Sequence, residues 1–306
     1  MANKTINTKK WFKIAIIAYA IIIVAGIIMT VTFGPKLDIN FSGGTKISYS
    51  YEGEVAEKDF KDAVATALDK EFSISKNTSL AGDVNSYVIT LAGKDSISAE
   101  MQENITKALT EKFKDNNVEL YDSTSVSPTI AGSFFAKSLV AVLITALLVV
   151  LYVGIRFSKI GGVSAALTAF CSLVLDLLTA FFICVIFRLP IDMNFMAVVL
   201  TILGYSLNDT IVIYDRVREN KKLYPQLSVA ENVDMSVTST MVRNIVTTTT
   251  TVCAVITIII VSELYGLTTL RSFAIPMVFG LISGCVSSLF VSGPLWVMYK
   301  ERKSAK

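Results

Sequence analysis

Six long runs of apolar residues divide the chain, and shorter stretches containing charge, Gly or Pro separate them. The runs cover residues 14–33, 134–154, 163–187, 193–214, 245–261 and 273–298. Each is close to the length of helix that spans the ~30 Å hydrocarbon layer of a membrane. We therefore predict six transmembrane helices, preceded by a short tail at residues 1–13 and followed by another at residues 300–306.

The periodicity changes in residues 34–131, between the first two apolar runs. Alternating positions predict strands and 3.6-residue spacing predicts helices; the strands are expected at 46–51, 72–80, 85–91 and 118–126, and the helices at 56–71 and 98–114. The order β-α-β-β-α-β is that of a ferredoxin-like arrangement. The predicted fold class is an α-helical polytopic membrane protein with a small ferredoxin-like α+β extracytoplasmic domain between helices 1 and 2.

Charge is segregated along the chain, and this predicts its orientation. Residues 34–131 hold 10 lysines, no arginine and 16 acidic residues, a balance of −6, whereas the whole chain has a net charge of +3. Lys and Arg near the ends of membrane spans mark the cytoplasmic side. They occur in both tails, at Arg156 and Lys159, and around residues 215–242. We expect both termini and a loop at about 215–242 in the cytoplasm, within a five-helix bundle over 132–299.

Composition limits the possible chemistry. Hydrophobic residues make up 53% of the chain and charged residues 17%, the mean hydropathy is +0.59, and histidine is absent. This excludes a disordered tail, a secreted disulfide scaffold and any histidine-dependent enzyme. The four cysteines fall inside apolar runs at spacings that fit no metal site, so we interpret them as packing residues. We expect no enzymatic activity, no cofactor and no metal.

A few charged residues interrupt the apolar runs. A charge at the bilayer centre costs ~2.5–3.5 kcal/mol even on a lenient scale, so each marks a candidate functional position. Asp176 lies in the third run, Asp209 lies beside Asn208 in the fourth, and Arg243 precedes the fifth. A carboxylate near an amide and an arginine can bind and release protons. We predict a proton relay of these four residues; the alternative is that they only tie helices together, the interpretation we favour for threonines 247–251.

Small residues at helical spacing predict close helix packing. Gly280 and Gly284 lie four residues apart in the sixth run, a pattern that lets a neighbouring membrane helix approach closely. We assign the same packing role to Gly204 in the fourth run.

Two motifs resemble the SecD/SecF family, membrane subunits of the bacterial Sec translocase within the resistance-nodulation-division superfamily. The first is the fourth-helix segment Gly204-Tyr-Ser-Leu-Asn-Asp-Thr-Ile-Val-Ile-Tyr-Asp-Arg-Val-Arg-Glu-Asn220. The second is an F-x-G-G element after the first helix, carried by Phe41, Gly43 and Gly44. The order of one helix, one external domain and five helices also fits, so the resemblance covers essentially the whole chain. One departure is Leu175-Asp176, where many members have His-Asp, and it makes the role of Asp176 less certain.

The resemblance implies a specific function. It predicts that the chain pairs with SecD in a twelve-helix unit of the bacterial cell membrane. That unit uses the proton motive force, or sodium in some marine members, to promote export of unfolded preproteins from the SecYEG channel, while ATP hydrolysis belongs to SecA. The expected partners are therefore SecD, the SecYEG channel with its SecA-driven translocase, unfolded preproteins and membrane lipid, without nucleic acid. Asp209 takes the position tied to ion flow in the family, and Arg243 matches an implicated arginine.

Three alternatives remain open from the sequence. The chain could be half of a proton-coupled small-molecule exporter of the same superfamily, although such exporters usually join two halves with large external domains. It could instead be a purely structural translocase subunit, against which Asp209 and Arg243 argue. The F-x-G-G element, finally, fits either a simple turn before the first strand or a hinge that couples the external domain to the bundle, because glycine permits positive φ and close backbone approach.

Overall fold

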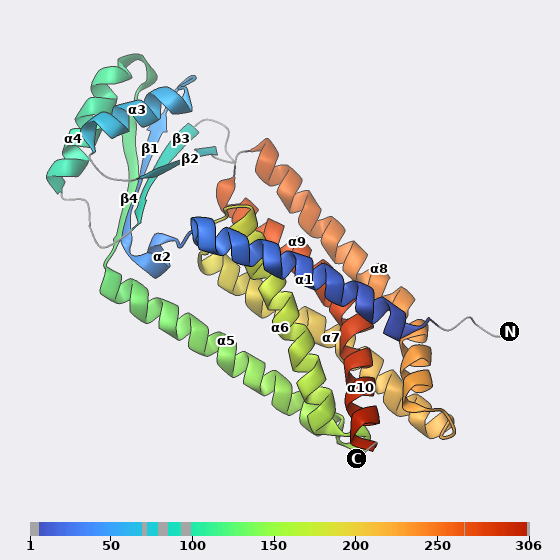
Figure 1. Cartoon of the computed structure of the whole chain (residues 1–306). Helices are drawn as coiled ribbons and strands as arrows, with labels where there is room; N and C mark the ends of the chain where they lie inside the picture. Colours follow the sequence, from blue (N-terminus) through green and yellow to red (C-terminus); the bar gives the residue numbers. More distant parts are fainter. Residues whose placement is uncertain (1–5, 69–71, 79–84, 93–98, 266, 305–306) are drawn as a thin grey trace.

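The computed structural model describes residues 6–68, 72–78, 85–92, 99–265 and 267–304. It consists of a bundle of long helices with a small α+β unit at one end (Figure 1). Six segments are helical, long enough and apolar enough to cross a membrane, and each predicted span coincides with one of them, the third extending one residue beyond its helix. The prediction of six membrane-spanning helices is confirmed in this sense.

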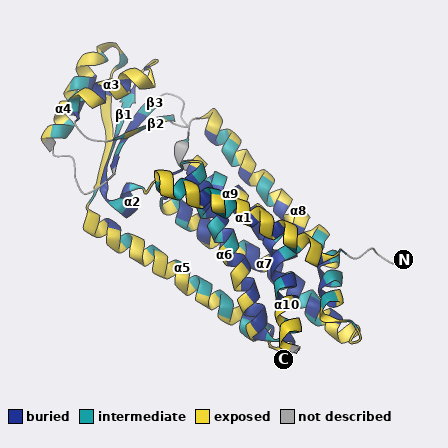
Figure 2. Cartoon of the chain, in the orientation of Figure 1, coloured by how far each residue is buried: buried dark blue, intermediate teal, exposed yellow. Residues whose placement is uncertain are grey.

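The bundle contains five continuous helices and one with a local irregularity. The continuous ones are α1 (Thr8–Phe33), α5 (Pro128–Arg156), α6 (Gly162–Ile186), α7 (Met193–Leu223) and α8 (Val229–Leu264). The sixth is formed by α9 (Thr268–Ser287), a π-helical turn at Ser288–Ser292, and α10 (Gly293–Ser304). Figure 2 shows α6, α7 and α9 largely buried at the centre, whereas α1, α5 and α8 expose broad outer faces.

The α+β unit has the element order that the sequence predicts. It comprises β1 (Gly44–Tyr51), α3 (Glu57–Ala67), β2 (Ser73–Thr78), β3 (Asn85–Ala92), α4 (Ala99–Lys112) and β4 (Glu119–Val126). The strands form one sheet in the order β2-β3-β1-β4, with every neighbouring pair antiparallel. The ends of predicted elements at residues 69–71, 79–80 and 98 lie outside the described residues.

An aromatic core holds the sheet to its two helices. The Tyr87 ring stacks on Phe60 with centroids 4.5 Å apart and on Tyr51 at 4.9 Å, so β1, β3 and α3 share one cluster. The Tyr87 hydroxyl donates to the Val55 carbonyl oxygen at 2.8 Å. Burial raises the pKa of Tyr51 and Tyr87, so both hydroxyls stay uncharged at neutral pH. The unit therefore has its own apolar core, separate from the bundle.

The F-x-G-G element forms the neck between this unit and the bundle. Phe41 lies in the one-turn helix α2 (Ile39–Ser42) and stacks on Phe134 of α5, with ring centroids 5.8 Å apart. Gly43 has φ +78°, and a Cβ at this position would lie 2.9 Å from the Cα of Pro128. Gly44 pairs with Val126, so the two chain ends of the unit leave together. A side chain at Gly43 would disturb both the backbone and the packing here.

A second contact holds the C-terminal end of α1. Arg188, between α6 and α7, donates from Nη1 to the carbonyl oxygens of Gly34 at 2.8 Å and Phe33 at 3.1 Å. Leu37 pairs with Ile191 as an isolated parallel bridge just beyond. The segment that leads from α1 into the neck is therefore fixed to the connection between the central helices.

The segment expected as a loop at 215–242 is mostly helical, which corrects the sequence prediction. The helix α7 continues to Leu223 and α8 begins at Val229, so only a short connection separates them. Ser228 and Glu231 form a capping box that starts α8. The end of an apolar run marks where a helix leaves the lipid, but it does not mark where the helix itself ends.

The three glycines predicted to pack helices lie in different surroundings. A Cβ on Gly280 would come 2.1 Å from Cδ1 of Ile202 in α7, and one on Gly284 would come 3.0 Å from Cβ of Ser206. A Cβ on Gly204 would meet no atom within 4 Å, and Gly204 is exposed on the outer face of α7. Gly280 and Gly284 thus allow α7 and α9 to approach, whereas Gly204 does not pack against the rest of the described chain.

This difference gives a paired test. We expect Gly280→Val to lower the free energy of unfolding by about 1–3 kcal/mol, because the added methyl groups overpack the contact with Ile202, which is fully enclosed. Gly204→Val introduces the same β-branched residue into a helix but faces open space, so it should leave the stability of the chain nearly unchanged. Thermal unfolding of both variants in detergent measures the contrast; equal losses would contradict the packing described here.

Candidate functional site

The carboxylate of Asp176 in α6 lies at the centre of the bundle and is completely buried. It accepts hydrogen bonds from three serine hydroxyls: Ser206 of α7 at 2.7 Å, and Ser283 and Ser287 of α9 at 2.6 and 2.8 Å. Within the described chain no Lys or Arg forms an ion pair with it. Three helices are thus joined through one carboxylate.

A fourth helix reaches the same cluster. The hydroxyl of Tyr19 in α1 donates to the carbonyl oxygen of Ser283 at 2.9 Å and lies 3.0 Å from its Oγ. The sequence predicts a role for Asp176 but not for Tyr19, Ser283 or Ser287. The four-residue spacing of the two serines was the available signal, because it places them on one face of α9.

Asp209 lies in α7, three residues beyond Ser206, and its environment is the opposite of that of Asp176. Its side chain is 2% exposed, and in the described part of the chain Oδ2 has no hydrogen-bond partner. The positive charge of Arg243 in α8 acts on it electrostatically, but no ion pair within 4.0 Å joins the two described residues. A buried carboxylate oxygen without a hydrogen-bond donor is costly to keep charged. Asp209 is therefore an unsatisfied carboxylate, in contrast to Asp176.

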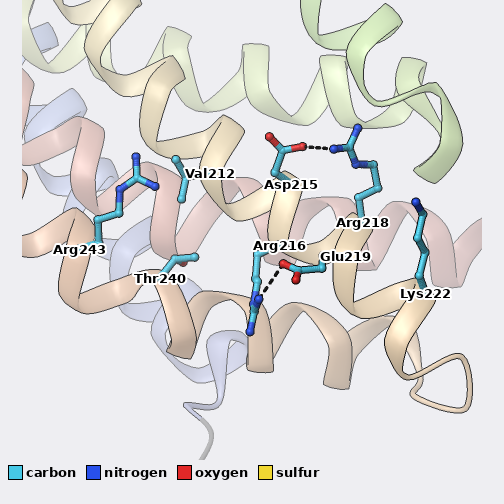
Figure 3. A pocket seen from close by; sticks show the side chains of 8 residues that line it. All are labelled: Val212, Asp215, Arg216, Arg218, Glu219, Lys222, Thr240 and Arg243. Carbon is cyan, nitrogen blue, oxygen red and sulfur yellow. Dashed lines mark hydrogen bonds and ion pairs between the residues drawn. The ribbon is translucent and has the colours of Figure 1, made fainter.

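Arg243 lines a cavity of about 460 Å³ between the polar extensions of α7 and α8 (Figure 3). Most other charges around the cavity are paired: Arg218 with Asp215 at 2.9 Å, and Arg216 with Glu219 at 2.7 Å. Asp215 also binds Arg156 of α5 at 3.1 Å. Among the described residues Arg243 has no such partner, so its charge remains available to Asp209.

Asn208, predicted to assist Asp209, points elsewhere. Successive helix residues are rotated by about 100°, so neighbours in sequence face different sides. Asn208 is exposed on the outer face of α7 near Gly204, and the described structure gives its amide no hydrogen bond. Of the four predicted relay residues, the structure thus brings Asp209 near Arg243, holds Asp176 in the serine cluster, and leaves Asn208 at the surface of the bundle.

A second group of hydroxyls joins the central helices nearer the end of the bundle remote from the sheet. Thr210 of α7 lies 2.9 Å from Ser288, and the hydroxyl of Tyr214 lies 2.7 Å from Thr168 of α6. Ser292, at the end of the π-helical turn, donates to Tyr214 at 3.1 Å. The turn therefore directs two serines, Ser288 and Ser292, toward α7.

The threonines of α8 mostly bond to their own helix. Thr247 and Thr250 each donate to backbone carbonyl oxygens of the preceding turn. Thr251 does the same and also lies 3.1 Å from the hydroxyl of Tyr205 in α7. In this run, Thr251 thus contacts α7, and Thr248 lies beside the Cys285 thiol of α9, as the favoured interpretation expects at these two positions.

Among the described residues, no three or more His, Cys, Asp or Glu side chains come together in a group that could hold a metal ion. The four cysteines are free, two of them buried. The site is therefore a set of carboxylates, hydroxyls and one guanidinium inside a membrane bundle.

Comparisons with known proteins agree on one family. The family model "Protein export membrane protein SecD/SecF, C-terminal" matches residues 105–302. Protein translocase subunit SecF of Alicyclobacillus acidocaldarius is 30% identical over 98% of this chain and 94% of its own length. Protein translocase subunit SecDF of Bacillus subtilis is 33% identical over 92% of this chain, which spans only 36% of that longer protein.

The fold agrees with these sequence matches. The crystal structure of a Thermus SecDF superposes with a TM-score of 0.80 at 24% identity, covering 98% of this chain and 39% of that one. A second SecDF crystal structure gives a TM-score of 0.70 at 25% identity over the whole chain. With six helices of membrane-spanning length, this chain is a multi-pass membrane protein that belongs to the SecD/SecF family of protein-export membrane proteins.

Proposed function

We propose that this chain is a SecF-type subunit of the Sec translocase that, together with SecD, uses the proton motive force to promote preprotein export. The names of its relatives, protein translocase subunits, support the export function. The observation that carries the coupling is Asp209, a buried carboxylate at membrane depth with a free oxygen and a nearby arginine. An ionisable residue inside a membrane bundle is by default a functional site.

The proposed orientation places both termini in the cytoplasm and the α+β unit, which we assign to the ferredoxin-like type, outside. The start of α1 and the end of α10 lie at the end of the bundle opposite the sheet (Figure 1). Thr8 donates its backbone N–H to Asp234 at 3.1 Å, and Lys9 pairs with Glu301 at 3.1 Å. Basic side chains such as Lys222 also gather at this end, as the positive-inside rule expects of a cytoplasmic face.

The outer face of α7 supports pairing with a second membrane subunit. Asn208 is polar, exposed and at the same level of the bundle as buried Asp209. Lipid offers an amide no hydrogen-bond partner, so such a residue is expected to face protein or water. Gly204, one turn away, leaves room for a helix to approach closely. We propose SecD as the occupant, within the larger assembly of the SecYEG channel, SecA and unfolded preprotein.

The coupling mechanism follows from the two opposing influences on Asp209. Burial without a donor makes its negative charge costly, and protonation removes that cost. The charge of Arg243 stabilises the deprotonated form, so a change in the distance between the two side chains changes proton occupancy. Because α7 is bonded through Ser206 to α6 and α9, a shift at Asp209 reaches the central helices. The neck at Gly43 then passes the motion to the external unit.

Replacing Asp209 tests the coupling. Asp209→Asn keeps the shape of the side chain and removes its titration, so the part of export that depends on the proton gradient should fall by about tenfold or more. The measurement is preprotein export into inverted membrane vesicles with and without a proton gradient. Asp59→Asn makes the same change on an exposed face of α3 and serves as the control. Full gradient-dependent export in Asp209→Asn would favour a purely structural subunit.

Replacing Gly43 tests the neck. Gly43→Ala places a Cβ against Pro128 at a positive φ, so we expect export to fall several-fold while the external unit remains folded. Gly53 also has positive φ (+73°) but lies in the turn after β1, away from the neck. Gly53→Ala therefore introduces comparable backbone strain, about 1 kcal/mol or somewhat more, without touching Pro128. If both variants export equally well, the neck does not couple the two parts.

A further inference from the structure

Among the described residues, four buried polar atoms around the level of Asp209 have no nitrogen or oxygen partner. They are Oδ2 of Asp209 itself, both amide atoms of Asn244, and Oγ1 of Thr248, which lies beside the Cys285 thiol of α9, only a weak hydrogen-bonding group. The three side chains are 2%, 1% and 5% exposed. Buried polar groups are nearly always hydrogen-bonded, so a group of unpaired ones indicates a bound water or ion.

Two hydrogen bonds fix how α7 and α8 lie against each other and bring these atoms to one level. The hydroxyl of Tyr205 lies 3.1 Å from Oγ1 of Thr251, and Nδ2 of Asn220 donates to Oγ of Ser236 at 2.9 Å. The antiparallel helices have equal lengths between these contacts, from 205 to 220 and from 236 to 251. Asp209, four residues from Tyr205, therefore lies at the level of the turn between Asn244 and Thr248.

One face of α8 extends from the level of Asp209 to the cavity. Thr240, one turn before Asn244, lines the cavity together with Val212 and Arg243. Thr240, Asn244 and Thr248 follow one another at four-residue intervals and are all buried. The cavity volume of about 460 Å³ admits several water molecules of ~30 Å³ each. A row of polar side chains thus extends from a cavity large enough for water to Asp209.

The hydrogen-bonding capacity of these atoms indicates which ligand fits them. Asp209 Oδ2 and Asn244 Oδ1 accept hydrogen bonds, and Asn244 Nδ2 carries two donor hydrogens. The Thr248 hydroxyl can both donate and accept. A metal cation would bind only the acceptors and would lie in the field of Arg243. Water donates and accepts, so it alone satisfies the whole set.

We propose that Asn244 and Thr248 hold a short chain of water between the cavity and Asp209, and that Asp209 exchanges protons with the cytoplasm through this chain. The inference rests on the proposed function and adds a route to it. The carboxyl group of Asp209 gives its proton to the adjacent water, and the last water of the chain releases a proton into the cavity. Only O–H bonds break and form, and no redox partner is required. Asn244 and Thr248 are positioning residues, since they hold the water that reacts.

Thiol labelling tests for water directly and does not depend on transport. The four native cysteines are first replaced in the chain assembled with its partner, and single cysteines are introduced by Asn244→Cys and Val255→Cys. A small, charged, water-soluble thiosulfonate is then added to the cytoplasmic side. Asn244→Cys should react, whereas Val255→Cys, on the same helix and 5% exposed, should not. Lack of reaction at position 244, with normal reaction of Lys222→Cys at the cavity rim, would overturn the proposal.

Proton flux into vesicles tests the role of the hydroxyl. Thr248→Val keeps the side-chain shape and removes the hydroxyl, so flux should fall by about tenfold or more, whereas Thr248→Ser keeps the hydroxyl and should retain most of the flux. Thr250→Val is the matched control, because Thr250 is exposed and bonds only to its own helix. Normal flux in Thr248→Val would overturn the water route.

The two proposals fail in distinguishable ways. If Asp209→Asn loses proton flux while Thr248→Val keeps it and Asn244→Cys stays unlabelled, the coupling stands and the water route is wrong. If Asp209→Asn keeps wild-type flux, proton coupling at Asp209 is wrong, and the route to it fails even if position 244 is labelled. Thermal unfolding of each variant separates loss of flux from loss of fold, and Thr248→Ala removes the hydroxyl in a second variant if Thr248→Val does not fold.

Discussion

The hydrogen bonds to Asp176 are the interaction on which the arrangement of the bundle depends. Lipid gives membrane helices little hydrophobic reason to associate, so close packing and interhelical hydrogen bonds must hold them. Three serines from α7 and α9 donate to this carboxylate, and Tyr19 brings α1 to the same cluster. These contacts require that α7 and α9 lie very close, which Gly280 and Gly284 permit. The carboxylate and the glycines therefore depend on one another.

The second carboxylate of the bundle is left unsatisfied, and the difference separates support from function. Polar groups in a native core are generally paired, and exceptions concentrate where chemistry occurs. Asp209 shares α7 with Ser206 but lies on the side that meets α8, where, among the described residues, its oxygen and two neighbouring side chains have no nitrogen or oxygen partner. A fixed central cluster next to a seam of such polar groups would let one helix move without loss of the fold.

The sequence was sufficient for the helices and strands but not for their faces. Apolar run length predicts the six spans, and the change from a 3.6 to a 2-residue period predicts the order of elements in the α+β unit. It could not reveal that Asn208 faces outward while Asp209 faces inward, because the rotation of α7 is set by its packing against α6 and α9. Nor could it reveal Tyr19, whose hydroxyl resembles that of any interfacial tyrosine until its neighbours are known. The helical extension to Leu223 was missed because its polar residues end the apolar run while hydrogen bonds within the helix continue.

The glycine neck at Gly43 joins the bundle to the α+β unit, and Arg188 fixes the segment that precedes this neck to the connection between α6 and α7. A shift of the central helices therefore has a short path to the α+β unit.

Proton coupling requires that Asp209 itself gains and loses a proton. Infrared difference spectroscopy of the assembled complex, recorded between acidified and neutral external buffer, measures this directly. Proton exchange at Asp209 predicts a carbonyl band of a protonated carboxyl group that appears on acidification of the wild type and is missing in Asp209→Asn. Identical difference spectra for the wild type and Asp209→Asn would contradict it.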